Sequence, residues 1–187
     1  MLEEEKKHIK QAQGGNQESF GIIYDHYVSQ IYRFVFFKVS VKQVAEDLTH
    51  EIFLSAWQNI KNYKQKQFPI SSWLYQIARN KVIDHYRTDK KNISIDTEDF
   101  AEETLGFEEQ DDLDIPFAIN KVKSLIKLLK PEYQEVLIMR YVEDLDHKEI
   151  ASALNKSEGA VRLIQHRAIN ILKELYTKSA LQKRTYE

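Results

Sequence analysis

The sequence contains no cysteine, and only five glycines and three prolines among its 187 residues. The absence of cysteine excludes disulfide scaffolds, thiolate zinc sites and cysteine nucleophiles. The scarcity of helix breakers favours an all-α fold. No apolar run approaches the roughly 20 residues that a transmembrane helix needs, and the polar, acidic start does not resemble a secretory signal. We therefore expect a soluble, cytoplasmic, all-α protein.

The charges nearly balance overall but are unevenly distributed. Lysine and arginine number 27 and aspartate and glutamate 29, which gives a net charge of −2. Residues 1–91 carry 14 basic and 10 acidic side chains, and residues 121–187 carry 13 and 9. Residues 92–120 carry ten acidic side chains and neither lysine nor arginine. This pattern indicates two mildly basic domains joined by an acidic linker.

Apolar residues recur at spacings of three and four over most of the chain, which predicts helices. The expected helices span about residues 3–13, 17–40, 41–60, 71–88, 116–129, 131–142, 147–154 and 158–176. Asn16 can cap the second of these helices, and Ser71 or Ser72 the fourth. Residues 61–69 form a polar loop with three lysines and two aromatic residues. Residues 89–115 lack helical periodicity, so we expect a linker with little regular structure.

The helices expected at 147–154 and 158–176 have the pattern of a helix-turn-helix. Asp146 and Glu149 have the spacing of a capping box, and Ser157 can cap the second helix. The outward face of that helix carries Arg162, Leu163, His166, Arg167, Asn170 and Lys173. Arginines near the start of such a helix can bind guanine edges or phosphates. The alternative is an ordinary solvated helix in an all-α bundle.

Two sets of motifs, in a fixed order, carry a resemblance to a known family. The first set comprises residues 20–24 (FGIIY), 45–53 (AEDLTHEIF) and 73–80 (WLYQIARN). The second comprises residues 129–136 (LKPEYQEV), 149–151 (EIA), 158–162 (EGAVR) and 165–168 (QHRA). Together they resemble a bacterial RNA polymerase sigma factor of the extracytoplasmic-function (ECF) type. The chain departs from the family pattern at His50, on the surface expected to meet polymerase, and at Ala160, Leu163 and Ile164, in or beside the recognition helix. The departures in the recognition helix place the promoter sequence in question more than the function.

The resemblance implies a fold and a task. It implies a sigma-two-like helical bundle at residues 1–91, an acidic flexible linker at 92–115, a sigma-four-like helix-turn-helix domain at 116–178 and a tail at 179–187. Such a factor binds core RNA polymerase and directs initiation at specific promoters, melting the −10 element and recognising the −35 element. The implied partners are the clamp of the largest polymerase subunit, the flap of the second subunit and promoter DNA. Many members also bind an anti-sigma protein. No cofactor, metal or small-molecule substrate is implied.

The resemblance also implies which residues meet each partner. For core polymerase, the candidates are Glu46, Asp47, Thr49, His50 and Phe53. For the −10 strand, they are Lys64, Lys66, Phe68, Trp73, Gln76, Arg79, Asn80 and Arg87, because single-strand capture combines positive charge with aromatic stacking. For the −35 duplex, they are Lys156, Ser157, Arg162, Leu163, His166 and Arg167. The alternative is that Phe53, Trp57 and Trp73 are core residues and that the lysines are ordinary loop charges.

The acidic linker admits two interpretations. In the family, the linker threads the channel by which RNA leaves the polymerase, so a polyanion there would occupy a basic channel as RNA does. The alternative is a solvated spacer between two domains.

Two other function classes compete with the sigma interpretation. An enzyme is disfavoured, because the six histidines form no His-Glu-x-x-His motif and no glycine-rich phosphate loop is present. A helix-turn-helix regulator, with the first 90 or so residues as a sensing or dimerising domain, is the serious rival. A third class, a protein that only links other proteins, would leave the two basic domains unexplained.

Overall fold

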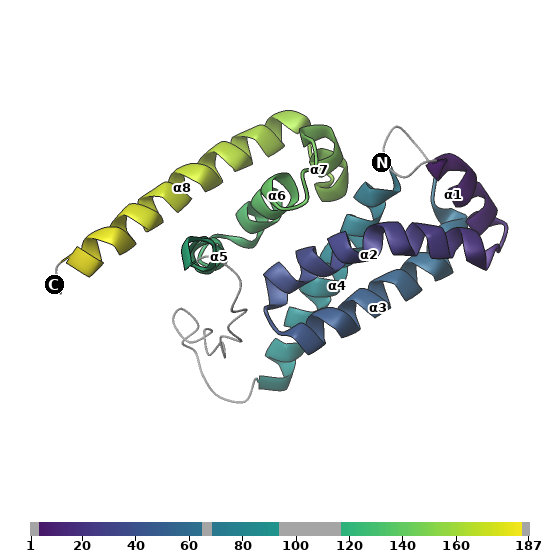
Figure 1. The fold of residues 1–187 in the computed structure, drawn as a ribbon, viewed down its shortest axis with the longest axis horizontal. Coiled ribbons are helices and arrows are strands. Elements are labelled where there is room, and N and C mark those ends of the chain that lie inside the picture. Colours follow the sequence, from purple (N-terminus) through teal and green to yellow (C-terminus); the bar gives the residue numbers. More distant parts are fainter. Residues whose placement is uncertain (1–3, 65–68, 94–116, 185–187) are drawn as a thin grey trace.

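The computed structural model describes residues 4–64, 69–93 and 117–184, and within these ranges every regular element is helical (Figure 1). The elements are α1 (Glu5–Gln13), α2 (Gln17–Val39), α3 (Lys42–Asn59), the 3-10 turn η1 (Ile60–Asn62), α4 (Ile70–Ile93), α5 (Phe117–Lys127), α6 (Pro131–Tyr141), α7 (His147–Leu154) and α8 (Glu158–Arg184). The expected all-α fold is confirmed. Each helix lies close to its expected position.

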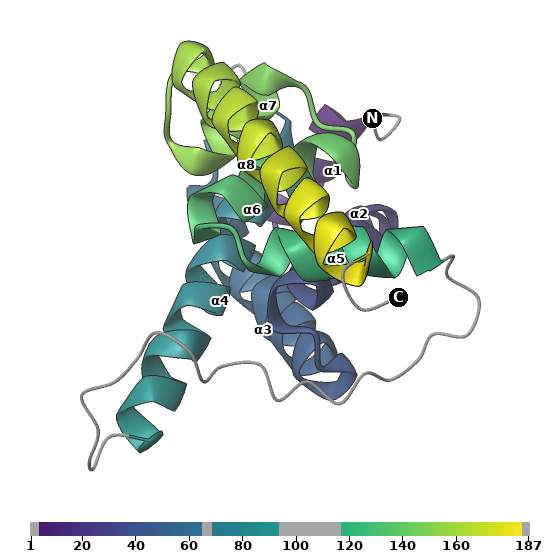
Figure 2. The ribbon, with the colours of Figure 1, turned by 90° about the vertical axis from the view of Figure 1, so that its left-hand side faces the viewer.

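Two helices extend beyond their expected ends. The α4 helix continues to Ile93 and α8 to Arg184, where the sequence predicts ends near 88 and 176. Both extensions lack an apolar stripe, but helix-compatible residues need no buried face to continue an established helix. The end of α4 projects away from the other helices (Figure 2). The acidic linker expected at 92–115 lies outside the described residues, apart from the last two residues of α4.

The expected cap of α4 is wrong, because Ser71 and Ser72 lie inside its first turn. The carboxylate of Glu5, in α1, accepts a hydrogen bond of 3.4 Å from the backbone N–H of Ile70. The hydroxyl of Tyr27, in α2, donates to the same carboxylate at 2.6 Å. The start of α4 is therefore fixed by a buried carboxylate from elsewhere in the chain. The predicted cap of α2 is confirmed, since the Asn16 side chain accepts from Ser19 N–H at 2.8 Å.

The N-terminal helices (α1–α4) and the C-terminal helices (α5–α8) pack directly on each other. One hydrophobic cluster includes Phe34 and Tyr75 from the first group and Ile138 and Ile150 from the second. The main contacts between the groups join α4 to α7 and α2 to α6. A smaller cluster, built on Leu129, lies among α5, α6 and α8. The face of α4 that meets α7 is thus an internal surface of the molecule.

None of the helices in the described ranges is both long and apolar enough to span a membrane.

The buried bond between Tyr27 and Glu5 predicts a measurable contribution to stability. Burial and the neighbouring carboxylate raise the pKa of Tyr27, so its hydroxyl stays a neutral donor. Tyr27→Phe leaves the Glu5 carboxylate without its shortest hydrogen bond, and we expect the free energy of unfolding to fall by about 1–3 kcal/mol. Urea denaturation measures this change. Tyr86→Phe, which removes an exposed bond to the Lys38 carbonyl, is the control and should change stability by less than about 0.5 kcal/mol.

Candidate functional site

The helix-turn-helix is built by short-range contacts. Asp146 accepts from the N–H of Glu149 at 2.7 Å, and the Glu149 side chain accepts from the N–H of Asp146 at 2.9 Å, so the predicted capping box is confirmed. Asn155 ends α7 in the left-handed conformation, with φ of 53°. Ser157 then accepts from the N–H of Ala160 at 3.2 Å. These contacts fix the turn that sets α8 against α7.

The outward face of α8 carries its cations into solvent. Arg162 and Arg167 are exposed, and Leu163 lies beside them with 48% of its surface accessible. Arg162 is 3.7 Å from Glu158, one turn earlier. His166 lies at 3.4 Å from the amide of Asn170. Lys156, at the turn, pairs with Glu132 of α6 at 2.6 Å. Most of the predicted −35 residues thus form one continuous exposed surface.

A hydrogen-bonded chain that the sequence did not indicate supports this surface. The side chain of Gln165 accepts from Nε2 of His147 at 2.6 Å and donates to the hydroxyl of Tyr141 at 2.8 Å. The chain joins α6, α7 and α8 behind the exposed cations. It therefore fixes the rotation of α8 about its axis.

The predicted −10 residues fall into three groups. Lys64, Asn80 and Arg87 are exposed, while Trp73 is half-buried with its ring 5.0 Å from that of Tyr63. Lys66 and Phe68 lie outside the described residues. Gln76 and Arg79 meet the C-terminal helices: Gln76 donates to the Ser152 carbonyl at 2.7 Å, and Arg79 pairs with Glu135 at 2.9 Å. Tyr63, at the start of the loop, thus lies against α4, while Gln76 and Arg79 on α4 are covered by the C-terminal helices.

A second ion pair joins the two groups of helices beside the first. The guanidinium of Arg33, in α2, donates two hydrogen bonds to Glu143, at 3.1 and 2.7 Å. The Glu143 side chain is fully buried, whereas that of Arg33 is 46% exposed. The bond to Glu143 raises the pKa of Arg33, while burial raises the pKa of Glu143 more than Arg33 lowers it. The geometry of the pair is good, yet the charged carboxylate is costly to bury.

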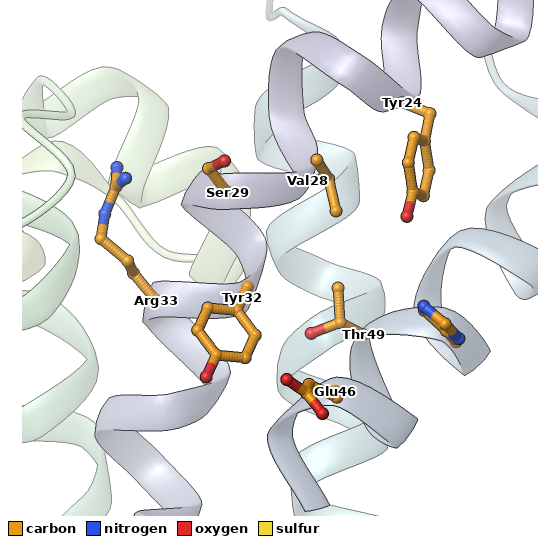
Figure 3. Close-up of a pocket in the computed structure, with 8 residues that line it drawn as sticks. Tyr24, Val28, Ser29, Tyr32, Arg33, Glu46 and Thr49 are labelled. Atoms are coloured by element: carbon orange, nitrogen blue, oxygen red, sulfur yellow. The ribbon is translucent and has the colours of Figure 1, made fainter. Parts of the chain in front are cut away.

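A pocket of about 350 Å³ opens between α2 and α3. Figure 3 shows Tyr24, Val28 and Tyr32 on the α2 side, facing Glu46 and Thr49 on α3. His50 also lines the pocket, so three of the five residues predicted to meet core polymerase lie together. The Thr49 hydroxyl donates to the Ala45 carbonyl and is buried.

The other two predicted polymerase contacts, Asp47 and Phe53, do not line the pocket. Asp47 is exposed and accepts from Gln43 at 3.2 Å. Phe53 is buried and packs edge-on against Tyr24, with the ring centroids 4.8 Å apart. Phe53 therefore supports the pocket from inside the fold. Trp57 also packs against the hydrophobic core, with its ring 5.0 Å from that of Phe20.

Comparison with known proteins places these surfaces in a family. The model of Sigma-70 region 2 matches residues 23–92, and that of Sigma-70, region 4 matches residues 119–172. The ECF RNA polymerase sigma factor SigM of Bacillus subtilis is 31% identical over 160 residues, which cover 83% of this chain and 94% of SigM. The chain belongs to the ECF RNA polymerase sigma factors. It therefore acts in promoter-specific initiation of transcription, with RNA polymerase and promoter DNA as its partners.

Other relatives of this sigma factor agree in family and fold. The ECF sigma factor BldN of Streptomyces coelicolor is 30% identical over 173 residues, which span 92% of this chain and 66% of BldN. Among solved structures, that of CnrH in complex with the cytosolic domain of CnrY has a TM-score of 0.71 at 20% identity, covering 93% of this chain and 97% of CnrH. The sigma factor RpoE in complex with the anti-sigma factor NepR, from Bartonella quintana, gives 0.63 at 19% identity, covering 86% and 98%. At these identities the two structures establish the fold alone.

The sigma factors are transcription regulators rather than a family of classical enzymes. Within the part of the chain that the structure describes, no group of three or more histidine, aspartate or glutamate side chains is arranged to hold a metal ion.

The raised pKa of Glu143 predicts a pH dependence of stability for this sigma factor. The folded protein holds the Glu143 proton more tightly than the unfolded chain does. This stabilisation is fully present below the ordinary carboxyl pKa of 4.5 and is lost as the pH rises through the folded-state pKa. Glu143→Gln cannot ionise. We therefore expect the stability of the natural protein, relative to this variant, to fall as the pH rises from about 4.5 towards 8.

Urea unfolding of both proteins across this pH range measures the difference. Asp144→Asn is a matched control, because Asp144 is fully exposed, adjacent in sequence, and has a φ of 52° that asparagine tolerates. Parallel stability curves for the natural protein and Glu143→Gln would contradict the prediction.

Proposed function

We propose that this sigma factor divides its task among three surfaces. The α2–α3 pocket binds core polymerase, the 61–69 loop with α4 captures the −10 strand, and the outward face of α8 recognises the −35 duplex. The observation that carries the proposal is the presence of region 2 and region 4 matches, in that order, in one chain. The division into domains at residues 1–91 and 116–178, with a linker at 92–115 and a tail at 179–187, is part of the proposal.

The geometry of α8 supports its role at the −35 element. Arg162 and Arg167 are exposed on the face that a helix-turn-helix presents to the major groove, with Leu163 between them as an apolar contact for a thymine methyl group. Lys156 and His166 are also exposed near these arginines in the sequence, and both side chains suit phosphate contacts. Ser157 serves the same surface by capping α8.

The start of α4 supports single-strand capture. Trp73 and Tyr63 form an aromatic pair next to Lys64, which is the combination of rings and positive charge that binds unpaired nucleotides. Lys66 and Phe68 extend this set in the sequence. Further along α4, Gln76, Arg79, Asn80 and Arg87 add hydrogen-bond donors. Flipping a base from the duplex costs a few kcal/mol, so the strand must be held by several such contacts.

The pocket between α2 and α3 supports the role in polymerase binding. Its rim combines the aromatic rings of Tyr24 and Tyr32 with the carboxylate of Glu46 and the imidazole of His50. Aromatic anchors flanked by charged groups are typical of the energetic centres of protein interfaces. A cationic side chain on the polymerase clamp would form a charge-assisted hydrogen bond with the Glu46 carboxylate.

The proposal includes a cytoplasmic location and no catalytic activity of the chain itself, since the polymerase performs the chemistry. An anti-sigma protein is a further proposed partner, because RpoE of Bartonella quintana is in complex with one. The rival, an ordinary helix-turn-helix regulator, predicts sequence-specific binding to duplex DNA by the free chain.

Transcription in vitro separates these functions. Purified core polymerase, this protein and sheared genomic DNA are combined, and the 5′ ends of the RNA are mapped. Discrete starts that depend on the chain and share paired upstream motifs support the sigma function. The absence of such starts with active core polymerase, together with protection of duplex sites by the free chain, would establish the regulator instead.

At a promoter found in this way, Arg162→Ala should weaken transcription through the −35 element. A base-contacting arginine contributes about 1–3 kcal/mol of discrimination between the right and the wrong base. Transcription should therefore fall by about 5- to 150-fold, and the variant should lose its preference for the base at one position of the −35 element. Lys178→Ala is the control, because Lys178 is exposed on the same helix beyond the matched region. Equal losses in both variants would contradict a base contact by Arg162.

Substitutions in the pocket should weaken binding of core polymerase. Glu46→Ala and His50→Ala each remove a side chain from the rim, and we expect the affinity to fall by about 5- to 30-fold. Fluorescence anisotropy of the labelled sigma factor, titrated with core polymerase, measures the change. Gln58→Ala lies on the same helix outside the pocket and should bind as the natural protein does. Unchanged affinity in both pocket variants would show that this pocket does not bind core polymerase.

A further inference from the structure

Tyr141, the last residue of α6, is an exposed aromatic residue whose hydroxyl is nevertheless held in place. Its accessible fraction is 61%, and its ring belongs to neither hydrophobic cluster of the described residues. The hydroxyl accepts a hydrogen bond of 2.8 Å from Nε2 of Gln165, in α8. Exposure combined with a fixed position is what a preorganised binding group needs.

The hydrogen bonds that hold this hydroxyl run in one direction. Oε1 of Gln165 can only accept, so its 2.6 Å contact with Nε2 of His147 requires an N–H on that ring atom. The other end of the same amide then donates to the Tyr141 hydroxyl. A hydroxyl carries one hydrogen and two lone pairs, and the O–H of Tyr141 meets no acceptor among the described residues. The chain from His147 therefore ends in an O–H donor at the surface.

This donor lies beside the surface proposed for the −35 duplex. Gln165 follows Arg162 by one turn of α8 and precedes His166, so its bond to Tyr141 brings the end of α6 to the edge of that surface. In a helix-turn-helix, the recognition helix enters the groove, and the elements that flank it meet the sugar–phosphate backbone. Tyrosine hydroxyls donate to phosphate oxygens, and the two donors behind Tyr141 polarise its O–H further.

We propose that Tyr141 donates a hydrogen bond to one backbone phosphate of the −35 duplex, and that Gln165 and His147 are positioning residues that turn its O–H outward. The donor is neutral, unlike those of arginine and lysine. The contact therefore helps to fix the register of the helix-turn-helix on the duplex without adding to the salt dependence of binding. The inference rests on the proposed function for the identity of this duplex.

A phosphate scan distinguishes this contact from a merely structural role of Tyr141. Core polymerase carrying this protein is bound to duplexes of a promoter mapped as described above, each with one phosphate of the −35 region replaced by a neutral methylphosphonate. For the natural protein, we expect replacement of one phosphate to weaken binding by about 5- to 20-fold. Tyr141→Phe should lose a similar factor on the unmodified duplex, and the same replacement should then cost it less than about twofold.

Tyr176→Phe is the matched control. Tyr176 is also an exposed tyrosine of the C-terminal helices, and it lies beyond the matched region, so this variant should bind every duplex as the natural protein does. Tyr141→Phe should also keep the slope of log affinity against log salt concentration, because it removes no charge. A loss of affinity in Tyr141→Phe without a phosphate whose replacement it makes harmless would indicate a structural role and overturn the contact.

Two further substitutions test how the hydroxyl is positioned. Gln165→Met removes the amide and keeps a side chain of similar length, while His147→Leu removes the donor that sets the direction of the amide. Each should at least halve the cost of replacing that phosphate, and neither should change this cost in the Tyr141→Phe background. A cost at that phosphate that both variants leave intact would overturn the positioning role of the chain.

Failure of this contact and failure of the sigma function give different results. Starts that depend on the protein, together with phosphate scans that are identical for the natural protein and Tyr141→Phe, would overturn the contact and leave the sigma function standing. If no starts appear and the free chain instead protects duplex sites, the same scan at those sites still tests Tyr141. One phosphate whose cost disappears in Tyr141→Phe would then support the contact in a regulator.

Discussion

The pairing of two buried carboxylates, Glu135 and Glu143, with arginines from the other half of the chain sets the arrangement of the molecule. Apolar packing between α4 and α7 supplies buried area, but the hydrophobic effect itself has no direction. A buried carboxylate tolerates no sliding, since it must keep its donors or lose several kcal/mol. The bidentate geometry at Glu143 therefore fixes how the two groups of helices meet.

The same logic operates at the start of α4. The buried Glu5 carboxylate accepts from the Tyr27 hydroxyl and from the N–H of Ile70, so it ties α1 to α2 and to the start of α4. These bonds set the position of the start of α4, where the ring of Trp73 lies 5.0 Å from that of Tyr63. A charge inside the fold thus determines where a surface proposed for DNA is displayed. The buried hydrogen bonds of Glu5 therefore matter more for the relative position of these helices than for the stability of the fold.

Sequence reasoning succeeded where the determining contacts are local. Apolar spacings of three and four predicted every described helix, and the cap of Asn16 and the Asp146–Glu149 capping box could be predicted because each spans one turn. It failed where the partner is distant: the cap of α4 comes from 65 residues away, and Arg33 meets Glu143 across 110. The exposed face of α8 could be predicted from its periodicity. The covering of Gln76 and Arg79 could not, because a polar residue at a helical position looks the same whether it faces solvent, DNA or another helix.

This division between local and distant contacts has a consequence for how the protein works. The surfaces proposed to recognise DNA are specified within single helices and their flanking turns, by contacts such as the Asp146–Glu149 capping box. Their accessibility is specified by contacts between the two groups of helices, such as the bonds of Gln76 to Ser152 and of Arg79 to Glu135. The shape of each proposed surface and its accessibility in this conformation are therefore determined by different kinds of contact.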